Sequence, residues 1–248
     1  MIPAAIYGRD AELEQLRQLV SRRRSFLLHG PSGVGKTLLL KHVAREVPQM
    51  VYCDESSSSQ TLFRHLADGL FARKNRHVLQ TCGPSGLNAI KDKSAVSIRG
   101  IVADALREAS YWIVLDHIQS PSQSFTGSVK DVCNQTETPL IAVARSAHME
   151  DVGFLLPMFS DRSDRYALRN FDLDTAKEFA LRRAEEMHLD AANREEAIQK
   201  IVHYGKGNPG AIAAMLQMAG SPKYITGQHV KLSPLYIDFR LRGDASHG

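Results

Sequence analysis

The residues Gly30–Thr37 read GPSGVGKT, a complete G-x-x-x-x-G-K-T/S phosphate-binding loop. An apolar run at 25–29 precedes the loop and predicts a strand, and the run at 38–44 that follows it predicts a helix. In this setting the glycines let successive backbone N–H groups point at phosphate oxygens, and the positive N-terminus of the helix strengthens that field. The stretch therefore predicts a nucleoside triphosphate site on a strand–loop–helix unit.

We expect the whole loop and the residue after it to contact the nucleotide. Lys36 is predicted to reach the β- and γ-phosphates, and the Thr37 hydroxyl to help hold Mg²⁺. The predicted contacts are Gly30, Pro31, Ser32, Gly33, Val34, Gly35, Lys36, Thr37 and Leu38.

A second magnesium ligand is predicted at Asp116. The apolar run YWIVL at 111–115 predicts a strand, and Asp116 follows where this strand leaves the core. The alternative is an aspartate that merely starts a turn. The next residue, His117, stands where fast ATPases usually carry an acid that orients and polarises the attacking water. Neutral imidazole can accept a hydrogen bond but supplies no negative charge, so slow hydrolysis is expected.

Two further residues are candidates for the catalytic site. Arg145 follows the apolar run at 140–144, and at the end of a strand it would lie near the γ-phosphate and could report its presence. A surface arginine is the alternative. Glu55, beyond the second predicted strand, is a candidate for positioning the water, and a solvated loop residue is the alternative there.

Strand and helix patterns alternate through residues 1–169, which predicts an α/β domain with a five-stranded parallel sheet. Strands are predicted at 26–29, 50–53, 111–115, 140–144 and 166–168. Helices are predicted at 10–23, 37–46, 61–72, 98–109 and 125–134. Residues 170–220 read as a three-helix lid, with helices at 174–187, 193–204 and 208–219. Residues 221–248 form a short tail with two β-like runs, at 229–232 and 235–239.

The composition is typical of a soluble globular chain, with 43% hydrophobic and 23% charged residues among 248. No apolar run approaches the ~18 residues of a membrane span, and the N-terminus lacks the layout of a signal peptide. We therefore expect a cytoplasmic protein with no membrane partner. Cys53, Cys82 and Cys133 show no metal-binding spacing and read as reduced thiols. A net charge of +4 permits an acidic partner such as nucleic acid without requiring one.

Residues 6–13 read IYGRDAEL and resemble the GR-x-x-E-L box of initiator-type AAA+ ATPases and of the related STAND ATPases. Gly207-Asn208-Pro209 resembles the G-x-P element of the STAND lid, and Arg145 falls where STAND proteins carry a strand-end arginine. Residues 165–174 resemble the junction between strand and lid, so the resemblance covers roughly 6–219.

The resemblance implies that the nucleotide is ATP, with ADP as the product and Mg²⁺ as the cofactor. Tyr7, Gly8 and Arg9 would border the adenine, and Pro209 would pack against it. No guanine-reading N/T-K-x-D motif occurs in the chain. The implied fold is an AAA+/STAND-like P-loop sheet followed by a helical lid.

Two functions agree with these features. The first is a nucleotide-controlled switch or assembly factor, in which ATP sets the lid angle and the binding of a protein partner or of further copies. The second is a DNA-associated AAA+ ATPase of the transposase-escorting or initiator type, which would oligomerise on duplex DNA with ATP. In the second, Arg162 or Arg165 would complete the site of a neighbouring subunit; a surface charge is the alternative for either.

A basic segment before the Tyr111 strand would face the DNA in the second function. A solvated surface loop is the alternative. Its basic residues are Arg73, Lys74, Arg76, Lys91, Lys93 and Arg99.

Overall fold

The computed structural model describes residues 6–54 and 58–245. By its internal contacts the chain divides into two compact units. The sheet unit comprises residues 11–30 and 36–168, and the helical unit comprises residues up to Asp10, Pro31–Gly35 and Arg169 onward. Five residues of the phosphate loop therefore group with the C-terminal helices.

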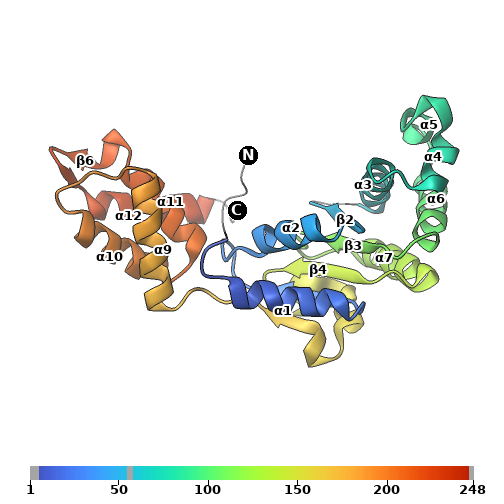
Figure 1. The fold of residues 1–248 in the computed structure, drawn as a ribbon, viewed down its shortest axis with the longest axis horizontal. Helices are drawn as coiled ribbons and strands as arrows, with labels where there is room; N and C mark the ends of the chain where they lie inside the picture. The colour runs from blue at the N-terminus through green and yellow to red at the C-terminus, as the bar shows by residue number, and fades with distance from the viewer. Residues whose placement is uncertain (1–5, 55–57, 246–248) are drawn as a thin grey trace. The chain divides into compact units, whose positions relative to one another are not determined.

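A five-stranded parallel sheet forms the centre of the sheet unit and confirms the predicted fold class (Figure 1). The strands are β1 Phe26–His29, β2 Met50–Cys53, β3 Trp112–Leu115, β4 Leu140–Ala144 and β5 Arg165–Ala167. Their order is β2-β3-β4-β1-β5, so β1 lies between β4 and β5. Because all strands are parallel, their carboxyl ends lie at one edge of the sheet.

Both faces of the sheet are covered, as continuous apolar strands require. Leu27, Val51 and Ile113 belong to a core cluster with residues of α3 Ser59–Ala72, α6 Ala95–Arg107 and α7 Gln123–Thr136. The alternate strand residues, such as Leu28 and Val114, are also buried. The sheet unit also contains α1 Asp10–Ser21, which begins at the unit boundary, and α2 Lys36–Glu46.

Serine caps begin the three helices α3, α6 and α7. Ser58, Ser94 and Ser122 each accept a hydrogen bond from the backbone N–H three residues on. This local chemistry explains why these helices begin two or three residues before their predicted starts at 61, 98 and 125.

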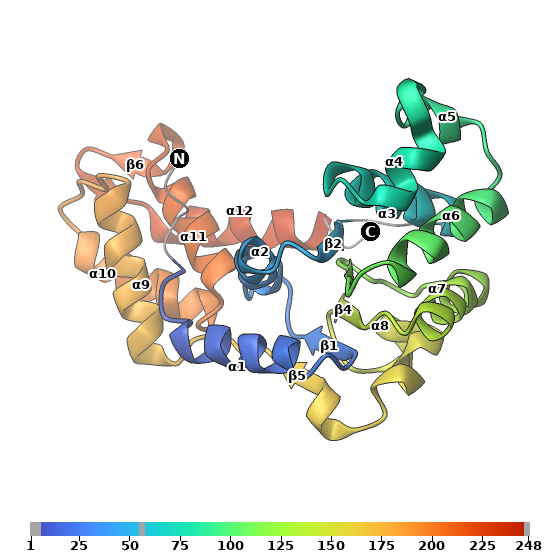
Figure 2. The same cartoon turned by 45° about the vertical axis from the view of Figure 1, so that its right-hand side comes forward.

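Short helices that the apolar pattern did not predict fill the connections. Between α3 and α6 lie α4 Arg76–Cys82, a 3₁₀ turn Gly83–Ser85 and α5 Asn88–Lys91. After β4 come α8 Met149–Val152 and the 3₁₀ segments Gly153–Phe159 and Arg162–Asp164. Figure 2 shows α4 and α5 beyond the β2 edge of the sheet unit.

Three helices of the helical unit follow the prediction closely: α9 Leu173–Glu186, α10 Arg194–Gly205 and α11 Pro209–Ala219. Their packing uses small residues, because Ala176, Ala180 and Ala184 form one fully buried stripe of α9. Gly207 has a φ of +72°, and a Cβ there would lie 2.2 Å from the Phe171 carbonyl oxygen. Only glycine permits this approach of α11 to the segment before α9.

The predicted β-like run at 235–239 is wrong, because these residues belong to the helix α12 Leu232–Ala245. In the described part of this tail, the strands are β6 Ile225–Thr226 and β7 His229–Val230, which pair as an antiparallel hairpin. Leu235 is buried, and Tyr236 stacks on Tyr204 with ring centroids 4.1 Å apart. The apolar residues are spaced for one side of a helix, a pattern that a five-residue window cannot separate from a strand.

In the part of the chain that the structure describes, no helix combines the length and apolar character that a membrane crossing requires.

Candidate nucleotide-binding site

The loop between β1 and α2 has a backbone that needs its glycines. Gly33 and Gly35 have φ values of +76° and +103°, which residues with a side chain rarely adopt. Lys36 is the first residue of α2, and its Nζ donates a hydrogen bond to the Gly30 carbonyl oxygen at 2.7 Å. Leu38, predicted to contact nucleotide, is 53% exposed on the first turn of α2.

Three predicted site residues come together at the carboxyl edge of the sheet. Asp116 directly follows β3 and Arg145 directly follows β4, and the Gly30 N–H donates to the Arg145 carbonyl oxygen at 3.2 Å. The charges of Asp116 and Arg145 both act on the Lys36 ammonium. Burial lowers the pKa of Lys36, and the negative charge of Asp116 partly offsets that effect. This convergence is what a metal–phosphate site requires.

The Asp116 carboxylate is buried and held on both oxygens. Oδ1 accepts the His117 backbone N–H at 2.8 Å, and Oδ2 accepts the Tyr52 hydroxyl. The Thr37 hydroxyl is another hydrogen-bond partner of Tyr52. Burial, followed by the hydrogen bond to Asp116, raises the pKa of Tyr52 well above its ordinary value. Tyr52 thus links Thr37 and Asp116, the two residues predicted to hold Mg²⁺.

The residues present fit a magnesium ion, since a hydroxyl and a carboxylate are the oxygen ligands it prefers. Among the described residues, no group of three or more His, Cys, Asp or Glu could hold a metal ion. Mg²⁺ bound by Thr37 and Asp116 would therefore take its other ligands from triphosphate and water, as it does in phosphoryl-transfer sites.

His117 lies in the left-handed region, with φ +55°. Its Nε2 is 3.8 Å from Asp116 Oδ2, and its side chain is 59% exposed. The imidazole therefore lies against the buried carboxylate. Glu55, the other candidate for positioning water, lies outside the described residues.

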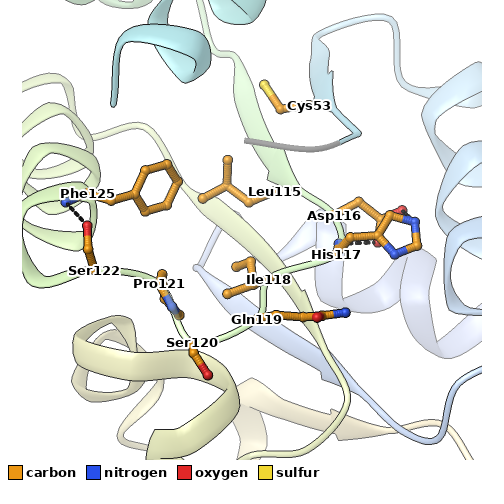
Figure 3. A pocket seen from close by; sticks show the side chains of 10 residues that line it. All are labelled: Cys53, Leu115, Asp116, His117, Ile118, Gln119, Ser120, Pro121, Ser122 and Phe125. Carbon is orange, nitrogen blue, oxygen red and sulfur yellow. Dashed lines mark hydrogen bonds and ion pairs between the residues drawn. The ribbon is translucent and has the colours of Figure 1, made fainter. Parts of the chain in front are cut away.

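A cavity of about 630 Å³ adjoins Asp116 (Figure 3). Figure 3 shows Asp116 and His117 together; the rest of the lining combines apolar side chains, among them Leu115 and Phe125, with polar ones such as Gln119 and Ser120. The cavity is large enough for several water molecules.

The GR-x-x-E-L box is anchored within the helical unit. The buried Arg9 guanidinium donates to the carbonyl oxygens of Val34 and Arg169, at 3.2 and 2.8 Å, and lies 4.2 Å from the Phe171 ring centroid. The Tyr7 hydroxyl donates to Glu178 at 2.6 Å, which raises the pKa of Tyr7. That Tyr7, Gly8 and Arg9 border an adenine stays a prediction.

The first residues of α11 contact the phosphate loop within the same unit. Asn208 Nδ2 donates to the Ser32 carbonyl oxygen at 2.9 Å, and the Gly210 N–H donates to the Gly33 carbonyl oxygen at 2.9 Å. A Cβ on Gly210 would lie 2.8 Å from Gly33 Cα, so only glycine fits. The resemblance gave a role to Pro209 alone; Asn208 was quoted only as the variable residue of the G-x-P element, and Gly210 was not considered.

Two other predicted arginines differ in their surroundings. Arg165 is half-buried and its Nε donates to the Phe159 carbonyl oxygen at 2.7 Å, whereas Arg162 is exposed. The Arg165 Nε is therefore committed to its own chain. That either arginine completes the site of a neighbouring subunit stays a prediction.

Comparison with known proteins identifies the family and the fold. The family model of the AAA ATPase domain matches residues 5–193. No curated protein matches the chain. Among solved structures, a Walker-type ATPase of Pyrococcus abyssi is 18% identical over 98% of this chain and 75% of its own, with a TM-score of 0.66.

Two further solved structures are similarly close in fold. Cdc6p from Pyrobaculum aerophilum is 15% identical, with 88% of this chain and 62% of its own covered and a TM-score of 0.65. The Aeropyrum pernix ORC1 protein, solved in complex with DNA, is 15% identical, with 97% and 66% covered and a TM-score of 0.66. The chain thus spans between 62% and 75% of the length of these three structures. With the phosphate loop, the strand-end aspartate and the parallel sheet in place, the chain belongs to the AAA ATPase domain family.

Proposed function

We propose that this protein is a nucleotide-controlled switch or assembly factor that binds Mg²⁺–ATP and hydrolyses it slowly. The observation that carries the switch is the contact between the phosphate loop and α11. The Ser32 and Gly33 carbonyls accept hydrogen bonds from Asn208 and Gly210. If the loop rearranges around a triphosphate and keeps these bonds, the start of α11 must move with it. If the bonds break, the start of α11 loses two of its contacts.

Lys36 and the backbone of the phosphate loop would bind the phosphates, Thr37 and Asp116 would hold Mg²⁺, and Arg145 would sense the γ-phosphate. Tyr7 to Arg9 and Pro209 would contact the adenine. Bound Mg²⁺ supplies positive charge that offsets the charge developing on the phosphates. The absence of an acid at His117 supports slow turnover.

Titration calorimetry with Mg²⁺ and a slowly hydrolysed ATP analogue tests this proposal. Lys36→Ala removes the cation that faces the phosphates and should weaken binding at least about 100-fold, near 2.7 kcal/mol. Arg45→Ala is the matched control, because Arg45 is an exposed cation in the last turn of the same helix. It should bind within about twofold of the wild type. Wild-type affinity in Lys36→Ala would show that this loop is not the site.

A second candidate function, ATP-dependent binding of duplex DNA, is favoured by the insert between α3 and α6. Lys74, Arg76, Lys91 and Lys93 are exposed on it. Arg73 does not belong to this surface, because its guanidinium donates to the carbonyl oxygens of Pro48, Met50 and Gly69. Arg99 pairs with Asp131 at 3.6 Å. The DNA in the Aeropyrum pernix ORC1 structure supports testing the same ligand here.

Binding of this kind should be independent of sequence and should weaken steeply with salt, since it would be directed at phosphates. Glutamate substitutions at Lys74, Arg76, Lys91 and Lys93 should abolish it and leave ATP affinity intact. If the wild type with an ATP analogue binds no duplex in low salt at micromolar protein, the DNA candidate is excluded.

A further inference from the structure

The side chain of Tyr52, on β2, lies on the same face of the sheet as the strand-end aspartate. In the register of β2 with β3, Tyr52 is opposite Val114. The pairing continues past the end of β3, because the Asp116 N–H donates to the Cys53 carbonyl oxygen at 2.9 Å. Alternate residues along a strand point to the same face, so Tyr52, Val114 and Asp116 share one. A long side chain at position 52 can therefore reach diagonally along this face to the carboxylate.

The helix α2 holds the Tyr52 ring in place. Lys41 Nζ lies 5.2 Å from the centroid of this ring and pairs with Asp54 Oδ1 at 2.7 Å, two residues beyond Tyr52. The ring itself is half-buried. Because Lys36 and Thr37 are the first residues of α2, the helix that contacts the ring also carries the phosphate-binding lysine and a predicted metal ligand. The position of the tyrosine is therefore fixed relative to the metal–phosphate site.

The Asp116 carboxylate depends on such contacts because its side chain is only 1% exposed. A buried carboxylate needs hydrogen bonds that replace those of water. Oδ1 accepts one at 2.8 Å from the backbone N–H of His117, its own neighbour in the chain (Figure 3), and Oδ2 accepts one from the Tyr52 hydroxyl on a different strand. Each oxygen of an ionised carboxylate can accept more than one hydrogen bond. The tyrosine therefore fixes Oδ2 and still leaves it able to meet a metal ion.

We propose that Tyr52 is a positioning residue of the metal site, whose hydroxyl holds the Asp116 carboxylate in the orientation from which it meets Mg²⁺. This role rests on the proposed binding of Mg²⁺–ATP. With a donor on each oxygen, the carboxylate has little freedom to rotate, so metal binding does not have to pay for ordering it. A phenylalanine at position 52 would fill the same space but leave Oδ2 without its donor. The hydroxyl therefore matters for the metal and not for the nucleotide alone.

Calorimetric titration of the full chain with a slowly hydrolysed ATP analogue, once in Mg²⁺ and once in EDTA, tests this assignment. Tyr52→Phe keeps the ring and removes the hydroxyl. We expect its affinity in Mg²⁺ to fall about tenfold, the effect of losing one hydrogen bond to a charged group, and its affinity in EDTA to stay within about twofold. Tyr111→Phe is the matched control. It removes a hydroxyl at the opposite edge of the sheet, where the Tyr111 oxygen accepts a hydrogen bond from Asn75 at 3.2 Å, and should leave the ratio of the two affinities unchanged.

A double variant shows whether Tyr52 acts through Asp116. If it does, adding Tyr52→Phe to Asp116→Asn should cause no further loss of Mg²⁺-dependent affinity, whereas additive losses would overturn the proposal. Equal weakening of Tyr52→Phe in Mg²⁺ and in EDTA would also overturn it, because the tyrosine would then only support the local structure. Tighter Mg²⁺-dependent binding would overturn it as well, since the hydroxyl would then compete with the metal. If the wild-type protein binds the analogue in neither condition, the failure belongs to the proposed function itself.

Discussion

The two edges of the parallel sheet differ in what their charged side chains contact. At the amino edge, guanidinium groups bind groups of the protein. Arg23 donates to the Tyr111 carbonyl oxygen at 3.2 Å, Arg24 pairs with Asp164 at 2.9 Å, and Arg73 donates to the carbonyl oxygen of Pro48 at 2.7 Å. At the carboxyl edge, the exposed Arg145 guanidinium has no hydrogen bond or ion pair with any residue that the structure describes.

The difference shows how one sheet separates stability from ligand binding. Cations whose donors are satisfied by backbone oxygens are committed to the fold. Cations left with donor capacity near a buried carboxylate are available to an anion. Burial and the charges of Arg165 and Lys36 lower the pKa of His29, the last residue of β1. Mutations at the amino edge should therefore lower the free energy of unfolding and leave nucleotide affinity unchanged. Mutations at the carboxyl edge should weaken nucleotide binding instead.

The largest effect on stability is expected from Arg73→Ala. This change leaves three carbonyl oxygens near β2 without their donor, so the free energy of unfolding should fall by about 3 kcal/mol. Urea denaturation measures the loss, and nucleotide affinity of the folded protein should stay within about twofold. Lys93→Ala, at an exposed position of the same insert, is the control and should change stability little. An unchanged midpoint in Arg73→Ala would remove the distinction between the edges.

Asp116→Asn, at the carboxyl edge, is expected to change nucleotide binding. It removes the negative charge opposite the metal, so binding of Mg²⁺–ATP should weaken more than tenfold, about 1.4 kcal/mol or more. The same variant in EDTA serves as its own control and should bind ATP nearly as the wild type does. Equal weakening with and without the metal would mean that Asp116 only supports the local structure through Tyr52 and His117.

His117→Glu has the smallest expected effect, a rise of a few-fold in the rate of ATP hydrolysis. The substitution adds a carboxylate beside Asp116 without touching the hydrogen bond from its backbone N–H. A steady-state phosphate assay suffices to detect it. The opposite result would be a wild-type rate of ~1 s⁻¹ or more that is lost in the variant. The imidazole would then be catalytic itself.

Local sequence patterns were sufficient to predict the sheet and the phosphate loop. The strands at 26–29, 50–53 and 140–144 have the predicted bounds, since a short apolar run between turn residues is a local signal. The glycines of the loop are likewise required by its backbone. The five-residue run at 235–239 was misread because its helical spacing emerges only with residues on either side.

Contacts that depend on strand order could not be read from the sequence. Tyr52 reaches Asp116 because β2 pairs with β3, with Cys53 opposite Leu115. Arg73 was grouped with exposed basic residues, and only the packing of α3 beside β2 shows that it serves backbone oxygens.

Small-angle X-ray scattering on a sizing column tests the central claim, that the nucleotide controls the state of the protein. The samples are the protein with ADP, with a slowly hydrolysed ATP analogue, and with the analogue plus duplex DNA. We predict that the analogue alone changes the mass or the radius of gyration relative to ADP. A change that needs DNA would favour the second candidate function. Superimposable curves in all nucleotide states would contradict the account.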